Sequence, residues 1–178
     1  MTTSTGGQGG PERPTATEEI RDRLKKIPLF KKLADNPQNL DRVIEALEPV
    51  KIAAGKPIIV EGESGEEMYI LLKGEIEISR FTLEKEQFTV AKLNDSMNIF
   101  FGELALLDAD KRSASVAAIT DCELLVLTRT RFHEIGAKYT EIGWQMALEI
   151  AGMVAGRLRK ANEDSLLLFD ALLNELRE

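Results

Sequence analysis

The stretch that decides the fold is GKPIIVEGESGEEMYILLKGEIEISR, residues 55–80. Glycines punctuate it and leave three short runs, at residues 57–60, 68–72 and 75–80. In the last run Ile76 and Ile78 alternate with Glu75, Glu77 and Ser79, so the isoleucines should point inward and the polar residues should face water. Short strands separated by glycine turns predict a β-sandwich or β-barrel.

More strands are expected on the C-terminal side of this stretch. A hairpin through residues 83–86 leads into a run at 88–93, and two further strands span about 113–119 and 123–127, with a turn at Thr120-Asp121. The expected fold class is therefore mainly β with flanking helices.

Helical patterns lie on both sides of the strands. Thr17 is expected to cap a helix that Pro28 interrupts, and Asn36 with Pro37 begins a second helix that stops before Pro49. After the strands, Thr128 or Thr130 can cap a short helix that ends near residue 136. From Tyr139 apolar residues recur at helical spacing to Leu158, and the cluster at 162–165 is expected to end that helix and cap another.

Composition divides the chain into three parts and indicates which partners and which cell compartment to expect. Residues 1–16 are expected to form a disordered arm, residues 17–136 a β-barrel domain with N-terminal helices, and residues 137–178 a helical extension. Thirty acidic against 23 basic residues give a net charge of −7, which opposes binding to nucleic acid or to anionic membranes. With one cysteine, no basic leader and no apolar run of membrane length, the chain is expected to be cytoplasmic.

The segment with the clearest chemistry is Phe101-Gly102-Glu103-Leu104-Ala105-Leu106-Leu107, which precedes Arg112-Ser113-Ala114-Ser115. Gly102 opens a short helix whose first N–H groups suit a phosphate. Arg112 shares strand parity with Ala114, Val116 and Ala118, so it should point inward. A buried guanidinium needs an anion, which could be Glu103 or an exogenous phosphate.

These residues resemble the cyclic nucleotide-binding domains of the catabolite activator protein and of the regulatory subunits of protein kinase A. The resemblance covers about residues 27–132 and includes the entry Ile27-Pro28-Leu29-Phe30, the glycine-punctuated strands and the nine-residue interval from Glu103 to Arg112. It implies a jelly-roll-like antiparallel barrel with a C-terminal helical lid. In place of the glycine-rich turn usual before Phe-Gly-Glu, this chain has a longer loop at 94–100.

The resemblance also implies a role for each site residue. Arg112 would hold the exocyclic oxygens of a cyclic phosphate, Glu103 would accept from the ribose 2′-hydroxyl, and Ser113 would lie beside the phosphate. Backbone N–H groups near Gly102, Glu103, Leu104 and Ala105 would complete the cradle. Ile78 and Val90, inward by pattern, are candidates for the apolar wall around sugar and base. The implied ligand is cAMP or cGMP, with no cofactor.

The expected function is that of a non-catalytic sensor whose C-terminal helices rearrange when the nucleotide binds and present a changed surface to an effector protein. Gly152 and Gly156 predict a close neighbour for the long helix, either the barrel or the same helix of a second chain in a homodimer. Nucleic acid is not expected as a partner, because family regulators append a helix-turn-helix domain and only about a dozen residues follow Ser165.

Two alternatives accompany this interpretation. A nucleotide-free interaction scaffold would keep Glu103 and Arg112 as a structural ion pair. A metal enzyme of the cupin kind is disfavoured, because His133 is the only histidine and lies outside the strands. Cys122 is expected to be structural, because no neighbouring base would generate its thiolate.

Overall fold

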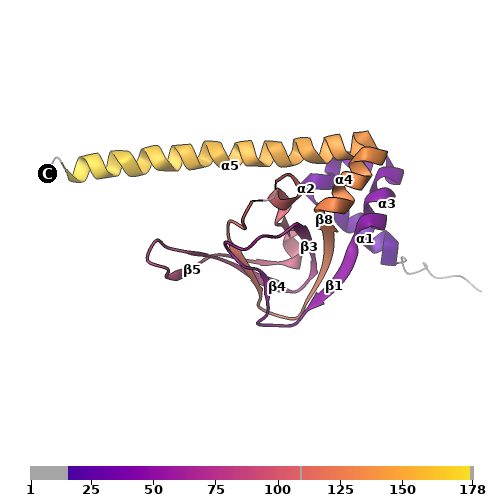
Figure 1. Cartoon of the computed structure of the whole chain (residues 1–178), viewed down its shortest axis with the longest axis horizontal. Helices are drawn as coiled ribbons and strands as arrows, with labels where there is room; N and C mark the ends of the chain where they lie inside the picture. The colour runs from indigo at the N-terminus through magenta and orange to yellow at the C-terminus, as the bar shows by residue number, and fades with distance from the viewer. Residues whose placement is uncertain (1–15, 109, 177–178) are drawn as a thin grey trace, which may run out of the picture.

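The structure is a computed structural model that describes residues 16–108 and 110–176. The arm predicted for residues 1–16 lies outside the described residues, apart from Ala16. The N-terminal helices gather at one end of the strands (Figure 1). They are α1 (Ala16–Leu24), α2 (Pro28–Lys31), the 3₁₀ turn η1 (Lys32–Asp35) and α3 (Pro37–Ala46). Along the described residues, no helix combines the length and apolar character that crossing a membrane requires.

Among residues 16–108 and 110–176, eight antiparallel strands form two four-stranded sheets, in the orders β1-β8-β3-β6 and β2-β7-β4-β5. The fold class predicted from the sequence is confirmed, although the strands make two facing sheets in place of a closed barrel. The strands are β1 (Glu48–Ile52), β2 (Pro57–Ile59), β3 (Glu67–Lys73), β4 (Glu75–Phe81), β5 (Gln87–Asn94), β6 (Phe100–Phe101), β7 (Ser115–Ala118) and β8 (Cys122–Thr128). Short 3₁₀ helices η2 (Asp95–Met97) and η3 (Glu103–Leu106) flank β6.

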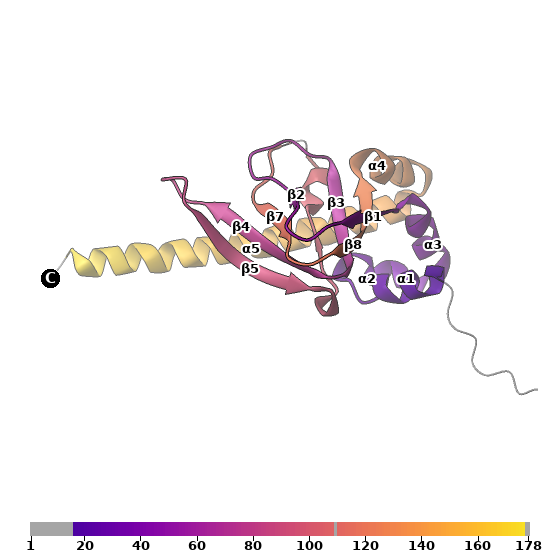
Figure 2. The same cartoon turned by 90° about the horizontal axis from the view of Figure 1, so that it is seen from below.

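Two apolar clusters hold these layers together. One fills the space between the helices and the sheet that contains β3 and β8, and includes Leu24, Phe30, Ile70 and Met146. The other lies among the strands and includes Ile59, Ile76 and Leu124. The β4–β5 hairpin projects beyond the rest of the sheets, at the end away from α1 and α3 (Figures 1 and 2).

The strand β1 was not predicted. Its sequence, Glu48 to Ile52, contains Pro49, which cannot donate to a strand ladder and therefore weighs against a strand. Because β1 lies at the edge of its sheet and pairs only with β8, the proline is tolerated there.

Two predicted orientations next to a bulge in the β4–β5 pair are wrong. The register shifts between Ile78 and Ser79, so that Ile78 pairs with Ala91 and Ser79 pairs with Thr89. Beyond the shift Ser79 is buried, contrary to the prediction that it faces water. Val90, the extra residue, has 53% of its surface exposed, so the prediction that it points inward is wrong.

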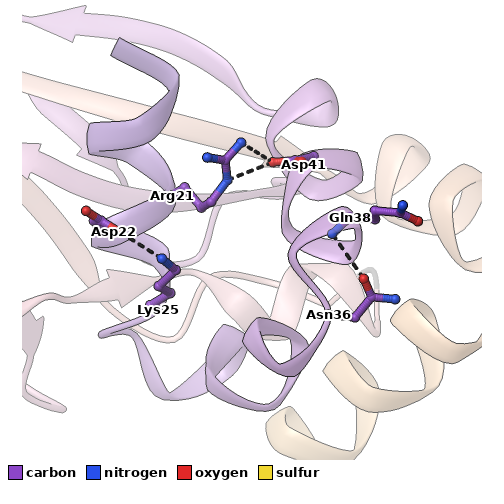
Figure 3. A network of polar contacts seen from close by, with 6 residues as sticks. All are labelled: Arg21, Asp22, Lys25, Asn36, Gln38 and Asp41. Atoms are coloured by element: carbon purple, nitrogen blue, oxygen red, sulfur yellow. Dashed lines mark hydrogen bonds and ion pairs between the residues drawn. The ribbon is translucent and has the colours of Figure 1, made fainter. Parts of the chain in front are cut away.

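The N-terminal helices follow their capping signals in part. Asn36 caps α3 as predicted, because its side chain accepts a hydrogen bond from the Gln38 N–H at 3.1 Å (Figure 3). Thr17 does not cap α1, which already begins at Ala16. Arg21 joins α1 to α3 through two hydrogen bonds to Asp41, of 2.9 and 2.7 Å (Figure 3).

Two helices follow β8. The first, α4 (Arg129–Lys138), is capped by Thr128 as predicted, and the second, α5 (Thr140–Glu175), is one helix of 36 residues. The break predicted at residues 162–165 is wrong: Ser165 directs its hydroxyl to the Ala161 carbonyl, 2.8 Å away, and the helix continues. From Arg157 to Leu172 every residue of α5 is exposed, and this part extends well past the sheets (Figure 1).

Candidate functional site

The residues predicted to form the phosphate cradle, called the cradle below, lie at the start of η3. Gly102 has a φ of 76°, a left-handed conformation that favours glycine. A Cβ atom at this position would lie 2.9 Å from both the Glu67 carbonyl oxygen and Arg112 Nη1. Glycine is therefore required here both for the backbone turn and for the close approach of β3 and of the arginine.

Arg112 points inward, as its strand parity predicted, and its side chain is only 8% exposed. Its Nη1 donates to the Gly102 carbonyl at 3.3 Å, and its Nη2 donates to Glu67 Oε2 at 3.0 Å. The counter-anion is thus Glu67, at the first position of β3, which the sequence analysis did not identify. Only the inward arginine signalled that some anion had to be present.

The loop at residues 61–65 fixes the backbone of Arg112 from one side. The Gly62 N–H donates to the Arg112 carbonyl at 2.9 Å, and the Arg112 N–H donates to the Glu63 carbonyl at 2.9 Å. A Cβ atom on Gly65 would lie 2.5 Å from Arg112 Nε. The glycine-punctuated loop therefore positions the guanidinium, in addition to turning the chain.

Glu103 is nearly enclosed, with a side chain that is 5% exposed. Its Oε1 accepts a hydrogen bond of 2.5 Å from Nη1 of Arg157, a residue of α5 whose side chain is 63% exposed. This pair ties the middle of α5 to the cradle. Arg157 was not among the predicted site residues.

The other residues predicted for the site differ in how deeply they are buried. The Ala105 N–H donates to the Gly102 carbonyl at 3.2 Å, so this member of the expected cradle already has an acceptor within the turn. Leu104 is half-buried and Ser113 is exposed in the bend before β7. Ile78 packs against the cluster among the strands, as its inward prediction required.

The pKa of Tyr69 reflects its burial and the charges beside Arg112. Its ring stacks on that of Phe101, with centroids 5.4 Å apart. Burial raises the pKa of the Tyr69 phenol, the charge of Glu67 raises that pKa further, and the charge of Arg112 opposes the increase. The phenol is therefore neutral at physiological pH, and the charges of this region are those of Glu67, Arg112, Glu103 and Arg157.

Two residues singled out from the sequence lie elsewhere. His133 is exposed on α4 and packs its ring edge-on against Phe132. Cys122 is buried, and its burial raises the pKa of the thiol, so the sulfur stays protonated. Within residues 16–108 and 110–176, no group of His, Cys, Asp or Glu side chains is arranged to hold a metal ion.

Comparison with known proteins gives a consistent result. Residues 49–139 match the sequence model of the family described as "Cyclic nucleotide-binding domain". The "Cyclic AMP receptor protein" of Thermus thermophilus is 32% identical over 154 residues, which cover 86% of this chain and 68% of that protein. A "cGMP-dependent protein kinase" of Caenorhabditis briggsae is 33% identical over 120 residues, 67% of this chain but only 15% of the kinase.

The fold agrees with the sequence matches. The crystal structure of the Thermus thermophilus catabolite activator protein superimposes with a TM-score of 0.69 at 33% sequence identity, and the match covers 79% of this chain and 62% of that one. The chain therefore spans less than two thirds of that structure and a small fraction of the kinase. These matches show the family of the matched region and nothing about what those proteins do outside it.

Proposed function

Because this chain belongs to the family of cyclic nucleotide-binding domains, we propose that it is a non-catalytic cytoplasmic regulator that binds cAMP in preference to cGMP. The observation that carries the proposal is the inward guanidinium of Arg112, 8% exposed, beside the left-handed Gly102. The order of preference follows the name of the Thermus thermophilus relative, which spans most of this chain, over that of the kinase.

In this proposal the nucleotide replaces contacts that the protein now makes internally. The exocyclic oxygens of the cyclic phosphate accept hydrogen bonds from Arg112 and from the N–H groups of Gly102, Glu103 and Leu104. These N–H groups are available because the first amides of a helix lack acceptors within it. Glu103 accepts from the ribose 2′-hydroxyl. Ser113 lies beside the phosphate, and Ile78 flanks sugar and base, whereas the exposed Val90 takes no part. The N–H of Ala105 joins the cradle only if it leaves the Gly102 carbonyl.

The signal passes through α5. Arg157 and the ribose hydroxyl compete for the same carboxylate of Glu103, so an occupied site changes the bond that ties α5 to η3. Residues 137–178 then act as the responding segment, and an effector protein reads their changed position. The mechanism requires only that the nucleotide binds more tightly when α5 is in one of its two positions than when it is in the other.

The test of binding is a thermal melt with and without nucleotide. We expect cAMP to raise the melting temperature more than cGMP does, and Arg112→Ala to abolish the increase. Arg42→Ala, a change on α3 outside the proposed contacts, should keep it. If neither nucleotide shifts the wild-type melt, and labelled cAMP does not titrate, the chain is an interaction scaffold that has the fold without the ligand.

We also propose that α5 pairs with the α5 of a second chain. It carries a seven-residue repeat of mostly exposed residues, Leu148, Ala155, Asn162 and Phe169. Four residues before these stand Trp144, Ala151, Leu158 and Ser165, and Leu172 continues this second series. Leu158 and Phe169 have 60% and 59% of their surfaces exposed. Leu158→Glu should shift the mass measured by light scattering from dimer to monomer, whereas Lys160→Glu should not.

A further inference from the structure

Glu67 occupies a position beside the phosphate cradle that no part of the proposed function uses. Its Oε2 accepts two hydrogen bonds of 3.0 Å, one from Arg112 Nη2 and one from the Glu66 N–H. Its backbone carbonyl abuts Gly102, where a Cβ atom would approach to 2.9 Å. The carboxylate is thus held in place from two directions, although its side chain is 40% exposed.

The charges around the cradle alternate and cancel. Glu67 pairs with Arg112, and Glu103 pairs with Arg157. A cyclic phosphodiester adds one negative charge to this neutral set, whereas a phosphomonoester at pH 7 adds nearly two. Because Glu67 and the phosphate would share the same guanidinium, every negative charge on the ligand is repelled by the carboxylate.

We infer that Glu67 is a specificity-determining residue, which favours singly charged cyclic phosphodiesters over doubly charged nucleotide monophosphates. This inference rests on the proposed function. The repulsion between Glu67 and the ligand grows in proportion to the ligand's charge, so a dianion loses about twice as much as a monoanion. The role is one of charge and not of shape, because Glu67 touches the arginine and need not touch the ligand.

The experiment compares three adenine nucleotides on three proteins. Binding of cAMP, 5′-AMP and the methyl ester of 5′-AMP is measured at pH 7.5 by competition with a fluorescent cAMP analogue, on the wild type, Glu67→Gln and Glu66→Gln. The methyl ester has the open chain of AMP but the single charge of cAMP, so it separates charge from ring closure. Glu66→Gln removes the same charge one residue away, from a side chain for which the described residues show no bond to Arg112.

In Glu67→Gln we expect the affinity for AMP to rise relative to that for its methyl ester by roughly three- to twentyfold, the range given by one unit charge at close distance in a partly hydrated site. Effects on the binding of base and sugar cancel in this ratio, because the two ligands share both. In Glu66→Gln the ratio should stay within about twofold, as for an exposed charge without a partner in the site. An unchanged ratio in Glu67→Gln, with cAMP still bound, overturns the inference and leaves the proposed function intact.

A second measurement needs no variant. Salt screens exposed charges, so in the wild type the preference for the methyl ester over AMP should shrink as ionic strength rises from about 0.05 to 0.5 M. A preference independent of salt would contradict a charge effect. If the wild type binds none of the three nucleotides, the proposed function fails, and the selectivity fails with it.

Discussion

Arg157 Nη1 and Glu103 Oε1 lie 2.5 Å apart, although 54 residues separate them in the sequence. Arg112, only nine residues from Glu103, bonds instead to Glu67. The structural ion pair considered between Glu103 and Arg112 is therefore wrong for the described structure: each partner has another counter-ion. The pair on α5 is the one that connects the cradle to the long helix, and its removal should be measurable.

Replacing Arg157 by methionine should destabilise the fold. Glu103 is almost fully enclosed and would lose the guanidinium that now satisfies Oε1, which costs about 1–3 kcal/mol for a buried acceptor left without a partner. The free energy of unfolding in urea gives the value. Arg159→Met, an exposed neighbour on the same helix, should change it by less than about 0.5 kcal/mol. Equal losses for the two variants would show that the Arg157 bond contributes nothing.

Two glycines of α5 should respond oppositely to alanine. A Cβ atom on Gly143 would lie 2.6 Å from the Cα of Gly136 in α4, so Gly143→Ala must separate two backbones and should cost about 1–3 kcal/mol. Gly152 has open space within 4 Å, so Gly152→Ala should stabilise the helix by about 0.5–1 kcal/mol. Thermal melts of both variants decide this. A loss of stability in Gly152→Ala would reveal a second chain packed at that position.

The cap of α3 offers a third test. Asn36→Ala removes the side-chain oxygen that accepts from the Gln38 N–H and should lower the free energy of unfolding by about 1 kcal/mol. Gln38→Ala is the matched control, because only its backbone N–H takes part in the cap. If the two substitutions cost the same, capping is not what Asn36 contributes.

Cys122 should make the fold sensitive to alkaline pH. Burial raises the pKa of its thiol in the folded chain, so the unfolded chain releases this proton first as the pH rises. The contribution to stability is therefore complete below roughly pH 8.5 and is lost as the pH climbs toward the raised pKa. Cys122→Ser removes the titrating group. Its unfolding free energy should fall less steeply between about pH 8 and 10 than that of the wild type, and parallel slopes would refute the assignment.

Local signals in the sequence predicted local structure well. Asn36 and Thr128 cap their helices because each needs only the N–H groups two or three residues ahead. Arg112 is enclosed, as predicted, but it precedes β7, which begins at Ser115, so its position does not follow from alternation along that strand. For the two caps the partners lie within a few residues, and the local sequence contains the whole geometry.

Partners far apart in the chain could not be found this way. Glu67 and Arg112 are separated by 45 residues, and only the pairing of the loop at 61–65 with residues 111–112 brings them together. The bulge after Ile78 reverses the alternation that placed Val90 inside. The neighbour expected at Gly152 does not occur within the described chain, because this glycine lies on a side of α5 where an added Cβ atom would meet nothing within 4 Å.

The length of α5 makes it a lever. At 1.5 Å per residue, its 36 residues span about 54 Å, and its fulcrum is the glycine contact with α4 near its first turn. A tilt of about 10° at that fulcrum would carry the far end through roughly 9 Å, the width of another helix. Under the proposed mechanism, an exchange of partners at the Glu103 carboxylate would in this way become a displacement large enough to make or break an interface.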